Sequence, residues 1–371
     1  MRMLLPLGLL PLLAVPGIAQ QTKVLPAVAE REGATAQPTL FSQGAGRIQQ
    51  IVDGNALYSK VAVLTGMSFR MDGSMMQKAD KRTLKGFKMY LGYAAKTPST
   101  MSTTFADNWK LDAQQQPMRY LVYSGDLVLP AQDALRRPFN VSVVFNQKST
   151  GQDFKFSYDK TKGDLLIEME VAGTAVSDYG YMLDAHAEST NRGWYTSYGT
   201  AGKLSNGEYP RILVQDDWNL KPGRKFTMSV SALRANYPSL MFLGASGTQW
   251  GSLNLPLPLD TLGMPGNVLE ASTDLAIPFT LMQSGNTYVG SLQLAIPAGN
   301  QSLGLKIYSQ ALFLDPKANK FGAALSPGLV VYVQSASQSM QYVFHKDSLS
   351  KTGSMGNAGE ALVVQFEGAI L

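Results

Sequence analysis

Few side chains in this sequence have the types and spacing that acid–base or nucleophilic chemistry requires. Asp184 and His186 are two residues apart, which places them on one face of a strand, and Ser189 and Thr190 follow closely. A histidine base with an orienting carboxylate and a nearby hydroxyl is the combination that a hydrolase uses. No Gly-x-Ser-x-Gly motif accompanies them. We therefore favour the simpler interpretation, a solvated strand end.

Acidic residues offer two further arrangements. Glu168 and Glu170 alternate along one strand and could imitate a glycosidase pair, but the solvent side of a half-buried strand is the simpler interpretation. Asp216 and Asp217 could join a calcium site, yet no Asp-x-Asp-x-Asp ladder supports one, so we favour linker charge. With no cysteine and two histidines, a multi-histidine or cysteine-ligated metal site is excluded. We predict no catalytic residue, no metal, no cofactor and no enzymatic activity.

The aromatic residues give the best indication of binding. Trp194, Tyr195 and Tyr198 cluster in a predicted loop, and Trp109 and Trp250 lie beside glycine or polar residues. An exposed ring can stack on the apolar face of a sugar, so Trp194, Tyr195, Tyr198 and Trp109 are the candidate ligand-binding residues. The alternative is that these rings cover sheet ends or a domain junction, which is the commoner role of large aromatic residues.

The composition limits the classes of protein to which the chain can belong. It has 371 residues, of which 45% are hydrophobic and 16% charged, with 35 glycines and 19 prolines. That balance excludes wholesale disorder and disfavours long charged helices and coiled coils. The formal net charge is +5, but no basic stripe with interleaved aromatic residues is present. We therefore expect no nucleic-acid partner.

The first 19 residues have the order of features found in a signal peptide. Arg2 precedes an apolar run, and Gly17 and Ala19 are small residues at the −3 and −1 positions of a cleavage site. The alternative, a membrane anchor, is disfavoured because three prolines break the run and it is short for a span. We predict a secreted protein, periplasmic or extracellular, without a membrane span in its mature chain. Residues 20–38 are predicted to be a flexible lead-in.

Beyond residue 40 the dominant pattern is alternation with period two, which indicates half-buried strands of antiparallel sheets. It is clear in residues 139–146, 164–171, 226–231, 292–296 and 329–333. Frequent Gly, Pro, Asn and Asp turns separate such segments, which is typical of β-sandwiches. We predict an all-β chain of two sandwich domains, jelly-roll-like or immunoglobulin-like. A loop-rich shift in composition near residues 190–225 marks the boundary between them.

Short motifs in both halves resemble uncharacterised secreted β-sandwich proteins of planctomycete-like bacteria. The second half contains YGT at 198–200, LGAS at 243–246, LPLPL at 255–259, LGMPG at 262–266, IP at 296–297, YSQA at 308–311 and SPGL at 326–329. The first half contains FRMD at 69–72, STTFADN at 102–108 and GDLL at 163–166, which resemble a jelly-roll-like module. The resemblance implies a fold and a compartment but no activity. Related proteins often carry one cysteine after the YGT motif, near which this chain has Gly202, and another after the Pro-Gly, where it has Asn267.

The C-terminal residues predict a discontinuous first domain. Residues 341–371 contain a Thr-Gly turn followed by a Leu-Val-Val-x-Phe strand, which resembles the closing segment of the jelly-roll-like module. A lone hairpin is marginal in water, so these strands must join a larger sheet. We predict a first sandwich of residues 39–190 plus 341–371 and a second of residues 194–338. The alternative is that the tail adds edge strands to the second sandwich.

These observations together predict an exported, non-catalytic structural or interaction protein of the cell envelope or extracellular matrix. The alternative function is a carbohydrate-binding module or an accessory to a glycoside hydrolase. The expected partner is an extracellular glycan or an envelope protein.

Overall fold

The computed structural model describes residues 21–57, 61–72, 78–132, 138–147, 154–175, 180–233 and 236–370. The signal peptide predicted for residues 1–19 lies outside them. The chain is 49% strand and 9% helix, which confirms the all-β class. Within the described ranges no helix is longer than four residues, and none is long and apolar enough to cross a membrane. The helices are α1 (Leu40–Gln43), α2 (Gly54–Leu57), η1 (Ala27–Ala29), η2 (Pro98–Thr100), η3 (Phe105–Asn108), η4 (Lys160–Lys162), η5 (Asp217–Asn219), η6 (Asp260–Leu262) and η7 (Asn300–Ser302).

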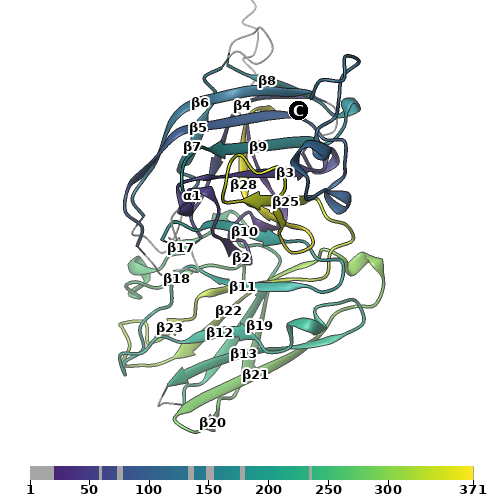
Figure 1. The fold of residues 1–371 in the computed structure, drawn as a ribbon. Coiled ribbons are helices and arrows are strands. Elements are labelled where there is room, and N and C mark those ends of the chain that lie inside the picture. The colour runs from purple at the N-terminus through teal and green to yellow at the C-terminus, as the bar shows by residue number, and fades with distance from the viewer. Residues whose placement is uncertain are drawn as a thin grey trace, which may run out of the picture.

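Three antiparallel sheets surround a large hydrophobic cluster, the first core, in the upper part of Figure 1. The six-stranded sheet has the order β26 (Ser354–Met355), β25 (Met340–His345), β3 (Gly46–Val52), β9 (Leu165–Val171), β5 (Arg82–Tyr93) and β6 (Arg119–Leu129). The five-stranded sheet has the order β1 (Gln21–Leu25), β28 (Val364–Ile370), β4 (Val61–Phe69) and β7 (Val141–Val144), with β8 (Phe156–Asp159) also on β4. The third sheet has the order β2 (Thr35–Gln37), β10 (Leu183–Ala187) and β27 (Glu360–Leu362).

A separate cluster, the second core, lies in the lower part of the molecule and consists of buried residues between Leu204 and Val333. One sheet has the order β11 (Trp194–Tyr198), β24 (Gly328–Tyr332), β22 (Lys306–Leu314), β14 (Ser239–Gly244) and β19 (Leu275–Phe279), with β23 (Ala323–Leu325) on β22. The other has the order β12 (Arg211–Val214), β13 (Lys225–Leu233), β21 (Thr287–Ala295) and β20 (Met282–Ser284). This part of the molecule also contains two two-stranded sheets: β15 (Gln249–Trp250) with β16 (Leu253–Asn254), and β17 (Leu257–Pro258) with β18 (Val268–Leu269).

Period-two alternation explains several of these strands directly. In β12, Ile212 and Val214 are buried while Arg211 and Leu213 are exposed, so one face packs on the second core and the other meets water. β7 follows the same pattern of burial. Such strands form where the sequence supplies an apolar face, because burying that face is the main favourable contribution to folding.

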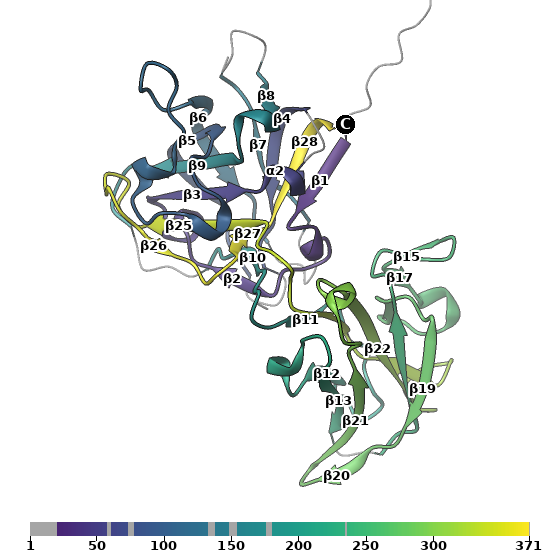
Figure 2. The same ribbon diagram turned by 90° about the vertical axis from the view of Figure 1, so that its right-hand side faces the viewer.

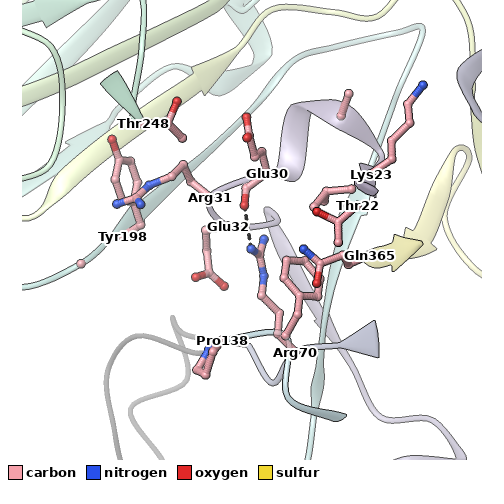
Figure 3. A pocket seen from close by; sticks show the side chains of 14 residues that line it. Thr22, Lys23, Glu30, Arg31, Glu32, Arg70, Pro138, Tyr198, Thr248 and Gln365 are labelled. Atoms are coloured by element: carbon pink, nitrogen blue, oxygen red, sulfur yellow. Dashed lines mark hydrogen bonds between the residues drawn. The ribbon is translucent and has the colours of Figure 1, made fainter. Parts of the chain in front are cut away.

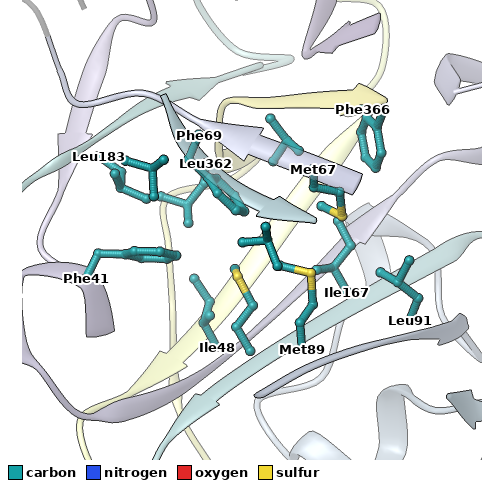
Figure 4. Packing of buried hydrophobic residues seen from close by; sticks show 14 of the residues in the cluster. Phe41, Ile48, Met67, Phe69, Met89, Leu91, Ile167, Leu183, Leu362 and Phe366 are labelled. Carbon is teal, nitrogen blue, oxygen red and sulfur yellow. The ribbon is translucent and has the colours of Figure 1, made fainter. Parts of the chain in front are cut away.

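The C-terminal strands pair with strands around the first core. β25 pairs with β3, β27 with β10, and β28 with both β1 and β4. Val364 and Phe366 are fully buried in the first core, and Figure 4 shows Phe366 near Met67 of β4. Figure 2 shows the same C-terminal strands, coloured yellow, among the strands of the first core.

The predicted flexible lead-in at residues 20–38 is wrong for the part that the structure describes. Residues 21–25 form β1 on the edge of β28, and residues 35–37 form β2 on β10. Leu25 and Ala29 are buried. The strands that pair with β1 and β2 lie more than 140 residues away in the sequence, so a local pattern of polar and small residues could not indicate them.

Candidate functional site

The N-terminal segment of residues 26–37, here called the junction segment, contacts strands of both cores. On the side of the first core, the Arg70 guanidinium donates hydrogen bonds to the carbonyl oxygens of Ala29, at 2.5 Å, and Glu30, at 2.8 Å. The amide of Gly33 donates to both carboxylate oxygens of Asp184, at 2.9 and 3.1 Å. These contacts fix the junction segment against the loop that follows β4 and against β10.

The second core holds the opposite side of the junction segment. Arg31 forms an ion pair of 3.0 Å with Glu270, whose side chain is fully buried. The Tyr332 hydroxyl donates to the carbonyl oxygen of Glu32 at 2.9 Å, and Lys306 reaches the carbonyl oxygen of Ala27 at 3.4 Å. The junction segment therefore connects the two cores through polar contacts on both of its sides.

Three carboxylates meet beside this segment. Glu32, Asp72 and Asp184 are all buried, and they each place an oxygen within 4.8 Å of the others. Arg70 Nε donates to Asp184 Oδ2 at 2.6 Å. Burial raises the pKa of Asp184 to about 7, although the positive charge of Arg70 acts in the opposite direction. Carboxylate oxygens suit a hard cation, but Arg70 already supplies a counter-charge, so the arrangement is a buried ion-pair network.

A cavity of about 660 Å³ opens beside the junction segment (Figure 3). Its wall includes Glu30, Arg31 and Glu32 of the segment, Arg70 of the first core, and Tyr198 of the second. The guanidinium of Arg31 lies over the Tyr198 ring, 5.4 Å from its centroid. Charges of both signs line the wall, and both arginines have carboxylate partners. The cavity can accept a small polar molecule, but its lining favours no particular sign of charge.

The predicted pair of Asp184 and His186 is not assembled, and its interpretation as a solvated strand end is wrong. His186 is 2% exposed, and its ring meets the Tyr332 ring edge-on at 4.6 Å between centroids. Burial, with the nearby positive charge of Lys306, lowers the pKa of His186 to about 3, so the imidazole is neutral. The Asp184 carboxylate instead binds Arg70 and the Gly33 amide. β10 is buried on both faces, because Leu183 and Ala185 pack in the first core and His186 packs on Tyr332.

Glu168 and Glu170 do not form a solvent-facing pair. Glu168 is fully buried and accepts hydrogen bonds from Arg47 Nη2 at 2.7 Å and Gln49 Nε2 at 2.5 Å, with an ion pair to Arg119. Glu170 accepts from the Tyr90 hydroxyl at 3.0 Å. This face of β9 is buried because a further apolar cluster, distinct from both cores, covers it. The cluster is formed by Ile51, Ala94, Met101, Phe105, Trp109, Leu166 and Val343. A period-two pattern does not show whether another part of the chain packs on the polar face of a strand.

Three of the four predicted binding aromatics lie on one strand, and Trp109 lies apart from them. Trp109 is 4% exposed and packs in the cluster over β9, with the Arg119 guanidinium 5.8 Å from its ring. Trp194, Tyr195 and Tyr198 lie on strand β11, paired with β24, and not in a loop. Tyr198 is buried and donates to the carbonyl oxygen of Glu270 at 3.0 Å. Trp194 and Tyr195 are half-buried, so the four rings do not form one binding surface.

Sequence reasoning missed the aromatic residue that the structure exposes most clearly. Trp218, in η5, is 67% exposed, and the guanidinium of Arg192 lies between its ring and that of Trp194. The signal available in the sequence was a tryptophan directly after Asp216-Asp217, in a predicted linker. The contact with Arg192 joins two segments that are about 25 residues apart, and no sequence pattern indicates it.

Neither a family model nor a curated protein matches this chain. The two positions at which the resemblance places cysteines are neighbours. The Gly202 amide donates to the carbonyl oxygen of Leu325 at 2.8 Å, and the Leu325 amide donates to Asn267 Oδ1 at 2.8 Å. A Cβ added to Gly202 would overlap the carboxamide of Asn267. The Asn267 side chain therefore lies directly against Gly202.

Proposed function

We propose that this chain is an exported, non-catalytic structural or interaction protein of the cell envelope or extracellular matrix. The observation that supports this most is that its candidate catalytic side chains are engaged in buried contacts within the protein. Asp184 is held by Arg70, Glu168 by arginines on β3 and β6, and His186 is buried and neutral against Tyr332. Removing one partner from a buried ion pair typically costs about 3–5 kcal/mol. These groups contribute to stability and have little access to a substrate.

The proposal includes the arrangement of two β-sandwich domains. The first would be a jelly-roll-like sandwich of residues 39–190 and 341–371, and the second a sandwich of residues 194–338 inserted into it. Two separate hydrophobic cores and the pairing of β28 with β1 and β4 support this plan. An inserted domain requires entry and exit close together. The Ser335 amide donates to the carbonyl oxygen of Ser189 at 3.1 Å, so the two connections are adjacent.

Cell fractionation with an antibody to the protein tests the location, and mass spectrometry of the exported form tests the processing. We expect the protein in the periplasmic or extracellular fraction, with its N-terminus at residue 20. Purified protein should not turn over chromogenic esters, glycosides or phosphoesters. A cytoplasmic location, or turnover that follows the protein through two independent purifications, would contradict the proposal.

Carbohydrate binding, as a module or an accessory to a glycoside hydrolase, is the second candidate function. The observation that favours it is the exposure of Trp218 beside Arg192. An extracellular glycan is the partner that this function requires.

A further inference from the structure

Trp218 presents a large apolar ring to solvent at a defined place in the fold. Its exposed fraction of 67% compares with 38% for Trp250 and 4% for Trp109. Leaving an indole in water forgoes the gain of burying it, which for a large side chain is about 1.5–3 kcal/mol. An exposed ring of this size is a recurrent feature of binding surfaces, because tryptophan supplies much contact area with few rotatable bonds.

The surroundings of Trp218 hold its ring in position. The Arg192 guanidinium lies 4.3 Å from the Trp218 ring centroid and 4.2 Å from that of Trp194. The Leu220 side chain is fully buried, and its carbonyl oxygen accepts the Gln334 amide at 2.9 Å. On the other side of Trp218, the Gln215 amide donates to the carbonyl oxygen of Thr227 at 3.0 Å, so the loop is anchored on both sides. A ring that is already ordered loses little conformational entropy when a ligand binds.

Arg192, which lies over one face of the Trp218 ring, and the neighbouring Asp217 still have hydrogen-bonding capacity. Arg192 Nη1 and Asp217 Oδ2 are 3.6 Å apart, which is an ion pair but too long for a hydrogen bond. Their side chains are 24% and 29% exposed. The pair therefore offers guanidinium donors and carboxylate acceptors to a ligand on the ring. Its charges cancel, so a phosphate or sulfate group gains no net attraction here.

We propose that Trp218, Arg192, Asp217 and Trp194, together called the Trp218 platform, bind a neutral polysaccharide by stacking a sugar ring on the exposed face of Trp218. A pyranose has a face of C–H groups and an edge of hydroxyls, which matches an aromatic face bordered by donors and acceptors. The inference rests on the proposed interaction function and gives that function a ligand class and a site.

Affinity electrophoresis of the full-length mature protein tests the proposal, with gels containing xylan, mixed-linkage β-glucan, galactomannan or arabinan. We expect retarded migration in at least one of these neutral polysaccharides. Trp218→Ala should weaken that binding by about tenfold or more, since stacking and ring burial are both lost. Trp218→Tyr, which keeps an aromatic face, should retain part of it. Trp250→Ala, which removes another exposed tryptophan, on β15, should bind as the unmodified protein does.

Each other outcome contradicts the proposal in a defined way. Absence of binding to every neutral polysaccharide, or unchanged binding by Trp218→Ala, would overturn it. Retardation only in alginate or polygalacturonate gels would overturn the neutral ligand class, and capture of a purified envelope protein through Trp218 without glycan binding would replace it with a protein partner. Circular dichroism checks that each variant is folded. An exported, inactive protein that binds no glycan would leave the proposed structural function standing, so the two failures are distinguishable.

Discussion

At the scale of single residues, two buried groups beside the junction segment have pKa values that are shifted in opposite directions. Asp184 has a raised pKa, so its folded form retains a proton that the unfolded chain has lost, and its contribution to stability falls as pH rises towards 7. His186 has a lowered pKa, so the unfolded chain gains a proton that the folded form excludes as pH falls below 6.5. His186 therefore makes the folded protein less stable as the pH falls. Its contribution can be isolated by replacing it alone.

We predict that His186→Phe makes the protein more resistant to acid. Phenylalanine retains the edge-on contact with the Tyr332 ring and removes a buried Nδ1 that has no hydrogen-bond partner among the described residues. The free energy of unfolding of the variant minus that of the unmodified protein should increase by about 1.4 kcal/mol for each unit that the pH falls between 6.5 and 3. Urea denaturation at pH 7.5, 6 and 5 measures the difference. A difference that does not change with pH would show that His186 is accessible to protons in the folded state.

At the scale of secondary-structure elements, the sequence predicted the strands whose burial is one-sided and failed for elements defined by distant partners. Phe226, Met228 and Val230 are buried in the second core and alternate with hydroxyl-bearing residues, so β13 could be predicted from its pattern alone. Residues 21–37 could not, since their order comes from hydrogen bonds to β28 and β10.

The candidate site follows the same rule, because each of its features is a contact between distant segments. The aromatic character of Trp194 was visible in the sequence, but its stacking on Arg192 and the exposure of Trp218 were not. The local polarity of residues 26–37 likewise gave no indication that Arg70 and Asp184 bind this segment.

We predict that the double variant Gly202→Cys with Asn267→Cys forms a disulfide under oxidising conditions. The two side chains would lie in contact, and the crosslink would close a loop of about 65 residues. A loop of this length stabilises by about 4 kcal/mol in the chain-entropy model, reduced by about 1 kcal/mol for the lost hydrogen bond from Leu325. Thermal unfolding with and without reductant measures the gain. Free thiols in the folded, oxidised variant would contradict the prediction, and each single variant serves as a control.

At the scale of the whole molecule, two hydrophobic cores are joined by adjacent connections and by the junction segment. Ser189 and Ser335 are hydrogen-bonded where the chain enters and leaves the second core. The Gln334 carboxamide donates to the carbonyl oxygen of Thr190 at 2.6 Å. Because the ends of the intervening segment are so close, removing it should not strain the strands of the first core.

We predict that replacing residues 191–334 with a short Gly-Ser linker leaves a chain that folds around the first core. The strands and their register would be retained, but the loss of Glu270 and Tyr332 removes partners of the junction segment. The shortened chain should therefore unfold cooperatively at a lower temperature than the full chain. Circular dichroism and calorimetry measure this, with residues 191–334 expressed separately as the complementary piece. A shortened chain without a cooperative transition would show that the two cores depend on each other.

The pairing of β1 with β28 determines how the protein responds to mechanical load. Gln21 and Gly368 are opposite each other in an antiparallel pair, so the chain enters and leaves these strands at the same end. Pulling on the two sides of this pair breaks its hydrogen bonds one after another, as in opening a zipper, and not all together as in shear. Force spectroscopy through residues 21 and 370 should show β1 peeling off at low force before either core extends. The protein would then gain length under tension while both cores stay folded.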